Sequence, residues 1–253
     1  MRIGGRWILG GIVALVVMVA LAAWAADETP ARSKVDVEAI ERIIHDYLLR
    51  NPQVIVDAMQ ALERRQEAEK AARVKETIAR RRAELSEDPS SPVGGNESGD
   101  VTVVEFFDYR CPHCRSAARA LAELVADDRG VRVVYKEFPI LGPDSLFAAR
   151  AALAARLQGR YEAFHGVLMA EGTLNRSRVI ELATSVGLDI ARLENDMQSP
   201  DIGSAIRRTH ALAEALSINA TPAFIIGDEL RLGALDREAL RALVARARER
   251  KDK

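Results

Sequence analysis

The sequence predicts an α/β domain with an inserted helical block, preceded by a separate helical extension. An apolar run, a helical pattern and a second apolar run follow one another between residues 101 and 138. This β-α-β order with a short connection favours parallel strands. The pattern is then helical almost throughout residues 145–197. The turn-rich stretch 88–99 separates this part from helical patterns nearer the N-terminus.

Length and composition set broad limits on the protein. The chain has 253 residues, 48% of them apolar and 29% charged, which is ordinary for a soluble globular protein with one large or two smaller domains. The formal net charge is −1. Nothing in this balance indicates nucleic acid as a partner.

Residues 1–25 are predicted to be a secretory signal peptide. Arg2 and Arg6 precede an apolar run from Trp7 to Ala23, and Ala23-Trp24-Ala25 has the small-x-small pattern of a cleavage site. The alternative is an uncleaved membrane anchor, because the apolar run approaches the length of a membrane span. In both cases we expect the rest of the chain to be exported to a compartment where disulfides persist.

Residues 35–86 are expected to form the helical extension. Two amphipathic helices should lie on either side of Asn51-Pro52, because a proline restricts the residue before it and suits the first turn of a helix. From Glu63 to Glu84 nearly every position is charged or alanine, so this spacer helix has no face to bury. We expect homo-oligomerisation through residues 35–62. The alternative is that these helices pack back on the second domain.

Residues 87–99 are expected to be a linker, and residues 100–250 the α/β domain with its helical insertion at about 143–200. The strand Val101–Phe107 ends in Cys111-Pro112-His113-Cys114, which contains both cysteines of the chain. The helical pattern that follows places Cys111 at a helix N-terminus, where free N–H groups and the helix dipole favour a thiolate. Cys111 is therefore the candidate attacking thiol, and the more buried Cys114 the candidate resolving thiol.

The two residues between the cysteines fit this chemistry. Pro112 suits the first turn of a helix. His113 can act as a cation or donor beside the thiolate, and stabilising the reduced form makes the disulfide a stronger oxidant. A zinc half-site is disfavoured because no second cysteine or histidine pair stands at ligand spacing. A purely structural disulfide would close too short a loop to stabilise much. We expect no metal and no cofactor.

The end of the domain is predicted to contain a helix over 206–216, a β-hairpin joined at Gly227-Asp228 and a closing helix from about Asp236. Pro222 opens the first hairpin strand, and the sequence alone does not decide whether the Thr221-Pro222 bond is cis. Three isolated histidines on helices are assigned no role: His45, His165 and His210.

This order of elements resembles the thioredoxin-fold DsbA-like family of exported thiol–disulfide oxidoreductases, over residues 100–250. The motifs that carry the resemblance run from Phe106 to Cys114 and from Ala220 to Phe224. The resemblance implies a redox-active Cys111-Cys114 disulfide. It also implies a cis proline at Pro222 beside the cysteines, with Thr221 and Pro222 contacting an extended substrate peptide.

Glu105 matches an acidic residue that the family carries beneath its active site. If Glu105 is buried behind Cys114, its pKa should rise, which would let it relay a proton as Cys114 is activated. The alternative is an ordinary carboxylate at the edge of a strand.

The front half resembles a particular branch of the family. Residues 47–52, the charged helix and residues 91–96 are similar to the N-terminal extension of the suppressor-of-copper-sensitivity (ScsC-like) and Com1-like proteins. Members of that branch can use the extension to oligomerise.

The leading hypothesis is a periplasmic oxidoreductase that forms or shuffles disulfides in unfolded or misfolded exported proteins, served by a DsbB-like or DsbD-like membrane redox partner. The histidine between the cysteines, His113, resembles the residue found in oxidase members of the family. The threonine before Pro222, Thr221, instead resembles the residue found in the isomerase members. One alternative is a copper-binding or copper-protective protein that uses the same cysteines. Another is a glutathione-transferase-like isomerase, whose chemistry would not need the second cysteine.

Overall fold

The structure, a computed structural model, describes residues 36–251. The expected signal peptide, residues 1–25, lies outside this range. Between residues 36 and 251, no helix combines the length and the apolar character that crossing a membrane requires. The chain forms two compact units, which divide between Glu63 and Arg64.

The first unit is helical. Helix α2 (Val37–Arg50) begins at Asp36, whose side chain accepts a hydrogen bond from the Ala39 N–H at 3.1 Å. It ends where the backbone and side-chain N–H groups of Asn51 both donate to the Tyr47 carbonyl. Helix α3 (Gln53–Arg80) follows directly after Pro52, as the sequence predicts. No residue of α2 is buried within the chain.

The second unit is built on a five-stranded mixed sheet with the strand order β1-β3-β2-β4-β5. Strands β2 and β3 are parallel, which confirms the prediction, and the other pairs are antiparallel. The strands are β1 (Val93–Gly95), β2 (Val101–Phe107), β3 (Val131–Glu137), β4 (Ala223–Ile226) and β5 (Glu229–Leu232).

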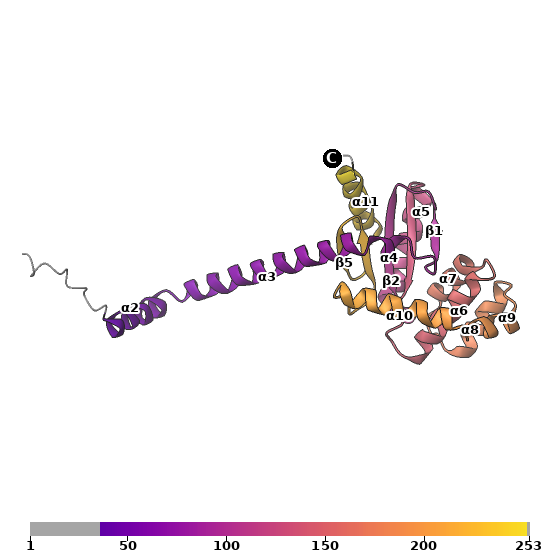
Figure 1. The fold of residues 1–253 in the computed structure, drawn as a ribbon, viewed down its shortest axis with the longest axis horizontal. Coiled ribbons are helices and arrows are strands. Elements are labelled where there is room, and N and C mark those ends of the chain that lie inside the picture. The colour runs from indigo at the N-terminus through magenta and orange to yellow at the C-terminus, as the bar shows by residue number, and fades with distance from the viewer. Residues whose placement is uncertain (1–35, 252–253) are drawn as a thin grey trace, which may run out of the picture. The chain divides into compact units, whose positions relative to one another are not determined.

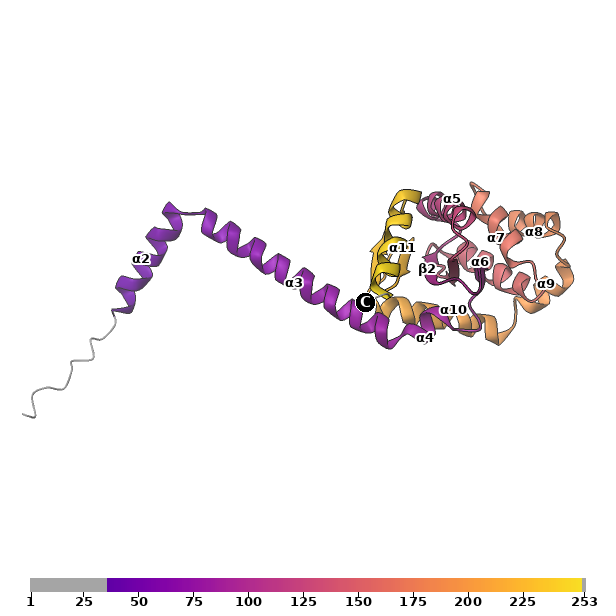
Figure 2. The ribbon, with the colours of Figure 1, turned by 90° about the horizontal axis from the view of Figure 1, so that it is seen from above.

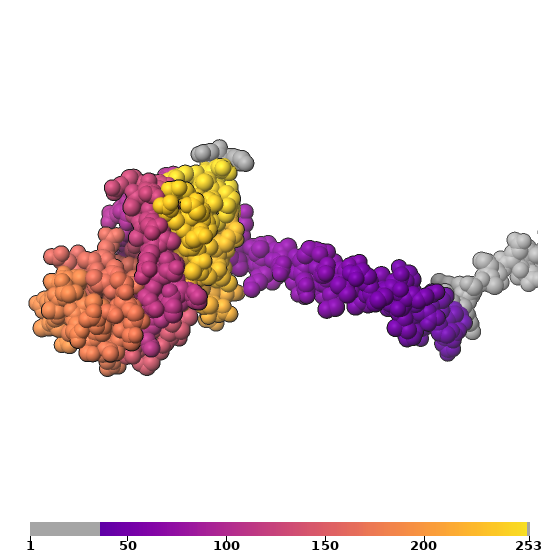
Figure 3. Space-filling view, turned by 180° about the vertical axis from the view of Figure 1, so that it is seen from behind, coloured from indigo at the N-terminus to yellow at the C-terminus, as the bar shows by residue number. Residues whose placement is uncertain are grey.

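Helices cover both faces of this sheet (Figures 1 and 2). Val103 faces α5 (Pro112–Asp127) and α11 (Arg237–Lys251), whereas Val104 faces α10 (Pro200–Ala215) and α4 (Arg82–Ser86). Alternate residues of a strand point to opposite faces, so β2 is apolar on both. Figure 3 shows the first face, with the magenta α5 between the yellow α11 and the orange helical block.

The helical block is inserted after β3. Its core includes a run of buried alanines on its first helix, which lets the neighbouring helices approach closely, and it also contains Phe107, Tyr109 and both cysteines. The block therefore packs directly against the end of β2 that carries the cysteine motif. Its helices are α6 (Pro143–Arg156), α7 (Tyr161–Ala170), α8 (Arg176–Ser185) and α9 (Ile190–Asp196).

The expected linker, residues 87–99, needs correction because it contains strand β1. A side chain at Gly94 would lie 2.9 Å from the Tyr135 ring, and one at Gly95 would lie 2.7 Å from the Val131 carbonyl. Gly95 also has a positive φ of +68°. The two glycines therefore allow a short edge strand to approach β3 closely, where the sequence suggested only a turn.

The expectation that the charged spacer helix has no face to bury needs correction at the C-terminal end of that helix. Ile78 on α3 and Leu85 on α4 are each only 2% exposed and pack in one cluster with Val104 and Ile225. The buried Lys136 Nζ strengthens this contact because it donates to the Glu84 carbonyl at 2.6 Å. Two apolar residues, Ile78 and Leu85, are thus sufficient to attach the C-terminal end of the charged helix to the sheet.

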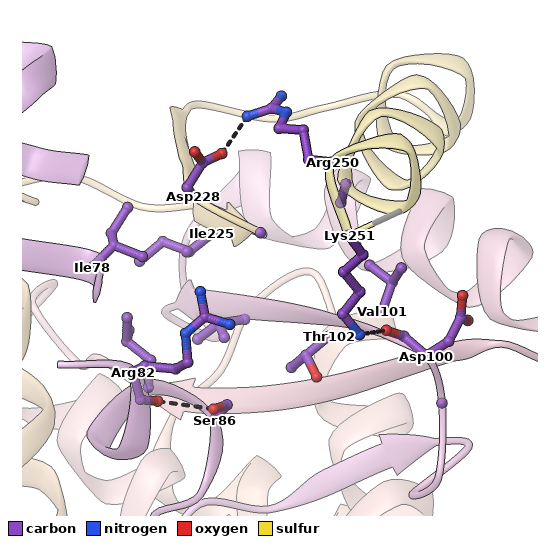
Figure 4. Close-up of a pocket in the computed structure, with 15 residues that line it drawn as sticks. Ile78, Arg82, Ser86, Asp100, Val101, Thr102, Ile225, Asp228, Arg250 and Lys251 are labelled. Carbon is purple, nitrogen blue, oxygen red and sulfur yellow. Dashed lines mark hydrogen bonds and ion pairs between the residues drawn. The ribbon is translucent and has the colours of Figure 1, made fainter. Parts of the chain in front are cut away.

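The attached end of α3 borders a hollow of about 330 Å³ at the end of the sheet where β2 begins (Figure 4). The cysteines follow the opposite end of β2, so this hollow lies away from them. Two basic side chains on α11 line it, and both have partners within the chain. Arg250 pairs with Asp228, and Lys251 donates to the Asp100 carbonyl.

Ile78→Ala should lower the free energy of unfolding by about 2–3 kcal/mol, because it leaves a cavity in the cluster between α3 and the sheet. Denaturant titration of the second unit's transition measures this loss. Leu157→Ala is the matched control, since Leu157 is 51% exposed and its truncation should change the free energy by less than about 0.5 kcal/mol. Equal effects of the two substitutions would contradict the attachment of α3.

Candidate active site

The cysteine motif forms the start of α5. Cys111 is the N-cap residue, and Pro112 occupies the first turn. The Cys111 carbonyl accepts hydrogen bonds from the N–H groups of Cys114 and Arg115, at 3.1 and 3.3 Å. Cys111 thus lies at a helix N-terminus, as predicted.

Both cysteines are free thiols in this structure. Cys111 is 5% exposed and Cys114 0%, which is the predicted order. Burial raises the pKa of Cys114 above its ordinary value, so this residue is held as a neutral thiol. Cys111 is less exposed than the sequence suggested, and its Sγ donates to the Thr221 carbonyl at 3.3 Å.

The Thr221-Pro222 peptide bond is cis, as the resemblance implied. Strand β4 begins at the next residue, and its pairing with β2 places Ala223 opposite Phe106. The Pro222 carbonyl accepts the Gly233 N–H at 2.8 Å. The Thr221 carbonyl is left facing Cys111, so the structure brings the two sequence motifs together.

His113 is exposed in the first turn of α5, next to Pro112. Its suggested influence on the Cys111 thiolate remains a prediction.

Glu105 is buried in the centre of the sheet. It lies opposite Tyr135 on β3 and Phe224 on β4, so the alternative of an edge-of-strand carboxylate does not apply. The side chain is 0% exposed, and neither carboxylate oxygen has a hydrogen-bond partner within residues 36–251. Burial raises the pKa of Glu105 to about 8. At neutral pH the Glu105 side chain is therefore a neutral carboxylic acid.

A hollow of about 500 Å³ between α5, β3 and α7 reaches Glu105. Arg115, Tyr135 and His165 are among the residues that line it. Its walls therefore come from both the sheet domain and the helical block.

Asp108 connects the end of β2 to the start of the helical block. Its Oδ1 accepts hydrogen bonds from the Arg110 N–H and the Ser145 hydroxyl, each at 2.8 Å. Its Oδ2 accepts the N–H groups of Ile140 and Leu141 at 2.8 and 2.9 Å. The Asp108 carbonyl also accepts the Cys111 N–H at 3.0 Å. This buried carboxylate thus holds the turn that positions Cys111.

Sequence reasoning missed a second buried polar cluster beside the cysteines. The Glu137 Oε1 accepts hydrogen bonds from the hydroxyls of Tyr109 and Tyr161, at 2.9 and 2.8 Å. The Tyr109 hydroxyl lies 3.0 Å from the His165 Nδ1. His165, to which no role was assigned, is therefore buried and hydrogen-bonded. The only signal in the sequence was the charged pair Lys136-Glu137 at the end of a strand in which Arg132 is the one other charged residue.

Burial also shifts the ionisation of this cluster. It raises the pKa of Glu137 to about 8, and the charges of Asp108 and Glu105 add to that rise. It lowers the pKa of His165 to about 3, so the imidazole is neutral.

Comparison with known proteins identifies the family. Residues 102–245 match the DSBA-like thioredoxin domain. The chain belongs to this DsbA-like family. Residues 36–69 match the N-terminal domain of the copper resistance protein ScsC. The DsbA-like fold and its helical extension, both predicted from the sequence, are confirmed.

Several solved structures are similar to this DsbA-like chain, and three of them illustrate the range. A thioredoxin-like oxidoreductase from Silicibacter pomeroyi is 50% identical, with a TM-score of 0.65 over 66% of this chain and 98% of that one. BcfH from Salmonella enterica Typhimurium is 28% identical, with a TM-score of 0.71 over 83% and 95%. A periplasmic thioredoxin-like protein from the same serovar is 31% identical, with a TM-score of 0.61 over 66% and 94%.

Part of the chain is also similar to a larger protein. The Na⁺/H⁺ antiporter NhaA 3 of Salinispora tropica is 32% identical over 158 residues, which is 61% of this chain. The matched region spans only 24% of that antiporter.

Glu105→Gln should change how stability depends on pH. The unfolded carboxyl loses its proton near pH 4.5 and the folded one near pH 8. The folded state thus binds more protons in that window, and the wild type becomes less stable as pH rises through it. Between pH 4.5 and 7 the wild type should lose roughly 3 kcal/mol of unfolding free energy more than the variant.

Denaturant titrations at several pH values measure this difference. Glu123→Gln, at an exposed position of α5, is the control and should leave the wild-type slope unchanged. Parallel slopes for Glu105→Gln and the wild type would show that Glu105 ionises normally.

Proposed function

We propose that the protein is an exported thiol–disulfide oxidoreductase that forms or shuffles disulfides in periplasmic client proteins. The observation that carries the proposal is the arrangement of Cys111, Cys114 and Thr221. Two thiols lie at the N-terminus of α5, and the Thr221 carbonyl is 3.3 Å from the Cys111 Sγ. Membership of an oxidoreductase family supports the same chemistry.

In the reducing direction, the Cys111 thiolate attacks one sulfur of a client disulfide. A bond forms between Cys111 and the client, and the other client sulfur leaves as a thiolate. Cys114 then loses its proton and attacks the Cys111 sulfur, which releases the second client thiolate and leaves the Cys111–Cys114 disulfide. The oxidising direction is the reverse, and its proton returns to Cys114.

Thr221 and Glu105 have separate roles in this scheme. Once the Cys111 sulfur carries a client, it no longer donates to the Thr221 carbonyl, which can then accept an N–H from an extended client segment. The Pro222 carbonyl already accepts the Gly233 N–H and is therefore occupied. Glu105 serves as the acid or base that exchanges a proton with Cys114.

We place this activity in the periplasm. Arg2, Arg6 and the apolar run from Trp7 to Ala23 support export, and one similar structure is of a periplasmic protein. A DsbB-like membrane partner would keep the enzyme oxidised, and a DsbD-like partner would keep it reduced.

We propose that the extension assembles copies of this chain. Eleven large apolar side chains of α2 and the first part of α3 are at least 37% exposed, and such a patch is rarely left in water. The match of residues 36–69 to the ScsC N-terminal domain supports an extension with its own role. The exposed side chains are Val37, Ile40, Ile43, Ile44, Tyr47, Leu49, Val54, Ile55, Val56, Met59 and Leu62.

Substituting each cysteine in turn distinguishes the attacking thiol from the thiol that resolves the mixed disulfide. Cys111→Ser should abolish reduction of a fluorescent peptide disulfide, because the attacking sulfur is lost. Cys114→Ser should accumulate a mixed disulfide between Cys111 and the peptide, detectable as an added mass under non-reducing conditions. Retained turnover in Cys111→Ser would overturn the proposal. Cu(I) binding by Cys111→Ser with partial affinity would instead favour the copper-protective alternative.

Variants that disrupt assembly test the proposal that the extension joins copies of this chain. Light scattering should give a multiple of the chain mass for the wild type and the mass of one chain for the double variant Ile43→Glu/Ile44→Glu. The reason is that the two substitutions place charge in the apolar patch. Glu41→Lys, which changes charge on the same helix without removing an apolar side chain, is the control. The monomer should still reduce the peptide disulfide but lose reactivation of a disulfide-scrambled enzyme, if several active sites must act on one client. A monomeric wild type would refute the assembly.

A further inference from the structure

The hollow between α5, β3 and α7 has a lining that the cysteine chemistry does not use. Its volume of about 500 Å³ lies within the range of roughly 300–1,000 Å³ that small-molecule sites occupy. It opens on the side of α5 that faces the helical block (Figure 3). Of the residues that the structure describes, neither Cys111 nor Cys114 lines it. The hollow is therefore a feature separate from the thiol pair.

Small side chains keep the hollow open. Ala118, Ala122 and Ala126 recur at intervals of four residues, so they lie along one side of α5. Gly166 and Ala170 line the hollow from α7. Small residues often let two helices approach closely, but here about 500 Å³ stays open between them. The apolar walls therefore surround a space rather than a packed contact.

Glu105 supplies a buried polar group to this space. The side chain lines the hollow, on the face of β2 that also carries Val103 and is covered by α5. Both carboxyl oxygens are buried, and neither has a hydrogen-bond partner within residues 36–251. Burying a polar group without a partner costs free energy. A ligand that pairs with Glu105 would remove this cost, because a protonated carboxyl both donates and accepts hydrogen bonds.

Three arginines add positive charge. Arg115, Arg119 and Arg129 line the hollow from α5 and the turn after it. Within residues 36–251, no ion pair or hydrogen bond joins their guanidinium groups to another side chain. The carboxylate at the end of α5 is engaged elsewhere, since Asp127 lies 3.0 Å from the Arg241 guanidinium on α11. The three guanidinium groups are thus free to bind an anion.

The other ionisable groups of the hollow do not cancel this charge. Glu162 is the single other carboxylate among the lining residues besides Glu105, and it faces three arginines. Burial lowers the pKa of His165 to about 3, so the imidazole is neutral. Burial raises the pKa of Tyr135, so its hydroxyl keeps the proton. The hollow therefore carries a net positive charge at neutral pH.

We propose that this hollow binds a small organic anion with an apolar body. The body lies against the small residues of α5 and α7, the anionic group pairs with Arg115 and Arg119, and a polar group of the body hydrogen-bonds Glu105. A carboxylate fits the arginines, because a guanidinium group binds it through two parallel hydrogen bonds. An amide or sulfonamide fits Glu105, because each offers a donor and an acceptor. This binding does not depend on the cysteines and goes beyond the proposed oxidoreductase activity.

Dansylglycine is the probe for this site. It combines a naphthalene ring, a sulfonamide and a carboxylate, and its fluorescence increases in an apolar environment. Titration of the protein should show saturable binding of one probe per chain. Dansylamide, which lacks the carboxylate, should bind about tenfold more weakly because the arginine contacts are lost. Equal affinities for the two probes would overturn the proposal.

Variants of the lining assign the signal to this hollow. Arg115→Gln/Arg119→Gln should weaken dansylglycine binding about tenfold and leave dansylamide binding unchanged. Arg119→Gln alone, at an exposed position, serves if the double variant does not fold. Arg207→Gln, which removes the same charge from α10 outside the hollow, is the control and should not change either affinity. Wild-type affinity after removal of the arginines would contradict anion binding here.

Two further variants test the contact with Glu105 and the competing apolar surface. Glu105→Leu removes both unpaired oxygens and should weaken dansylglycine binding about fivefold, because one hydrogen bond is lost. Unchanged binding in this variant would contradict the proposal. Ile43→Glu/Ile44→Glu disrupts the apolar patch of the extension and should leave the affinity unchanged. Loss of the signal in that variant would place the probe on the extension and overturn the site.

Discussion

Desolvation of ionisable side chains on the two central strands is the constraint on which the rest of the structure depends. Strands β2 and β3 are covered on both faces, yet they carry Glu105, Lys136 and Glu137. The free-energy cost of burial is offset in a different way for each side chain. Lys136 donates to the Glu84 carbonyl and the Ser91 hydroxyl, and Glu137 accepts from two tyrosines. Glu105 has no partner in the described chain, and its raised pKa keeps it neutral.

These different solutions divide the molecule into functional regions. Lys136 points toward α4, so its hydrogen bonds hold the end of the helical extension against the sheet. Glu105 and Glu137 face the opposite side, where α5 and α7 carry the cysteines and the aromatic side chains. The same strand β3 therefore holds the end of α4 on one face and lies against α5 and α7 on the other, because successive residues of a strand alternate between faces.

Much of the fold could be predicted because it depends on local patterns. The strand before Cys111, the helix after it and the parallel strand from Val131 followed from periodicity and turn signals. The errors occurred where one residue decides a contact. Ile78 attaches α3 to the sheet although the helix around it is charged, and Gly94-Gly95 forms an edge strand instead of a turn. Neither contact has a periodic signal, since each depends on a distant surface.

The sequence by itself determined the pair of residues to which we assign the chemistry. Cys111 and Cys114 are the only thiols, and their spacing places them on one turn of a helix N-terminus. Only the tertiary structure decided the surroundings of that pair. The Thr221 carbonyl reaches Cys111 from more than a hundred residues away, and Tyr109, Tyr161 and His165 meet Glu137 across three elements. Protonation depends on burial and on hydrogen-bond partners, and both are properties of the folded chain.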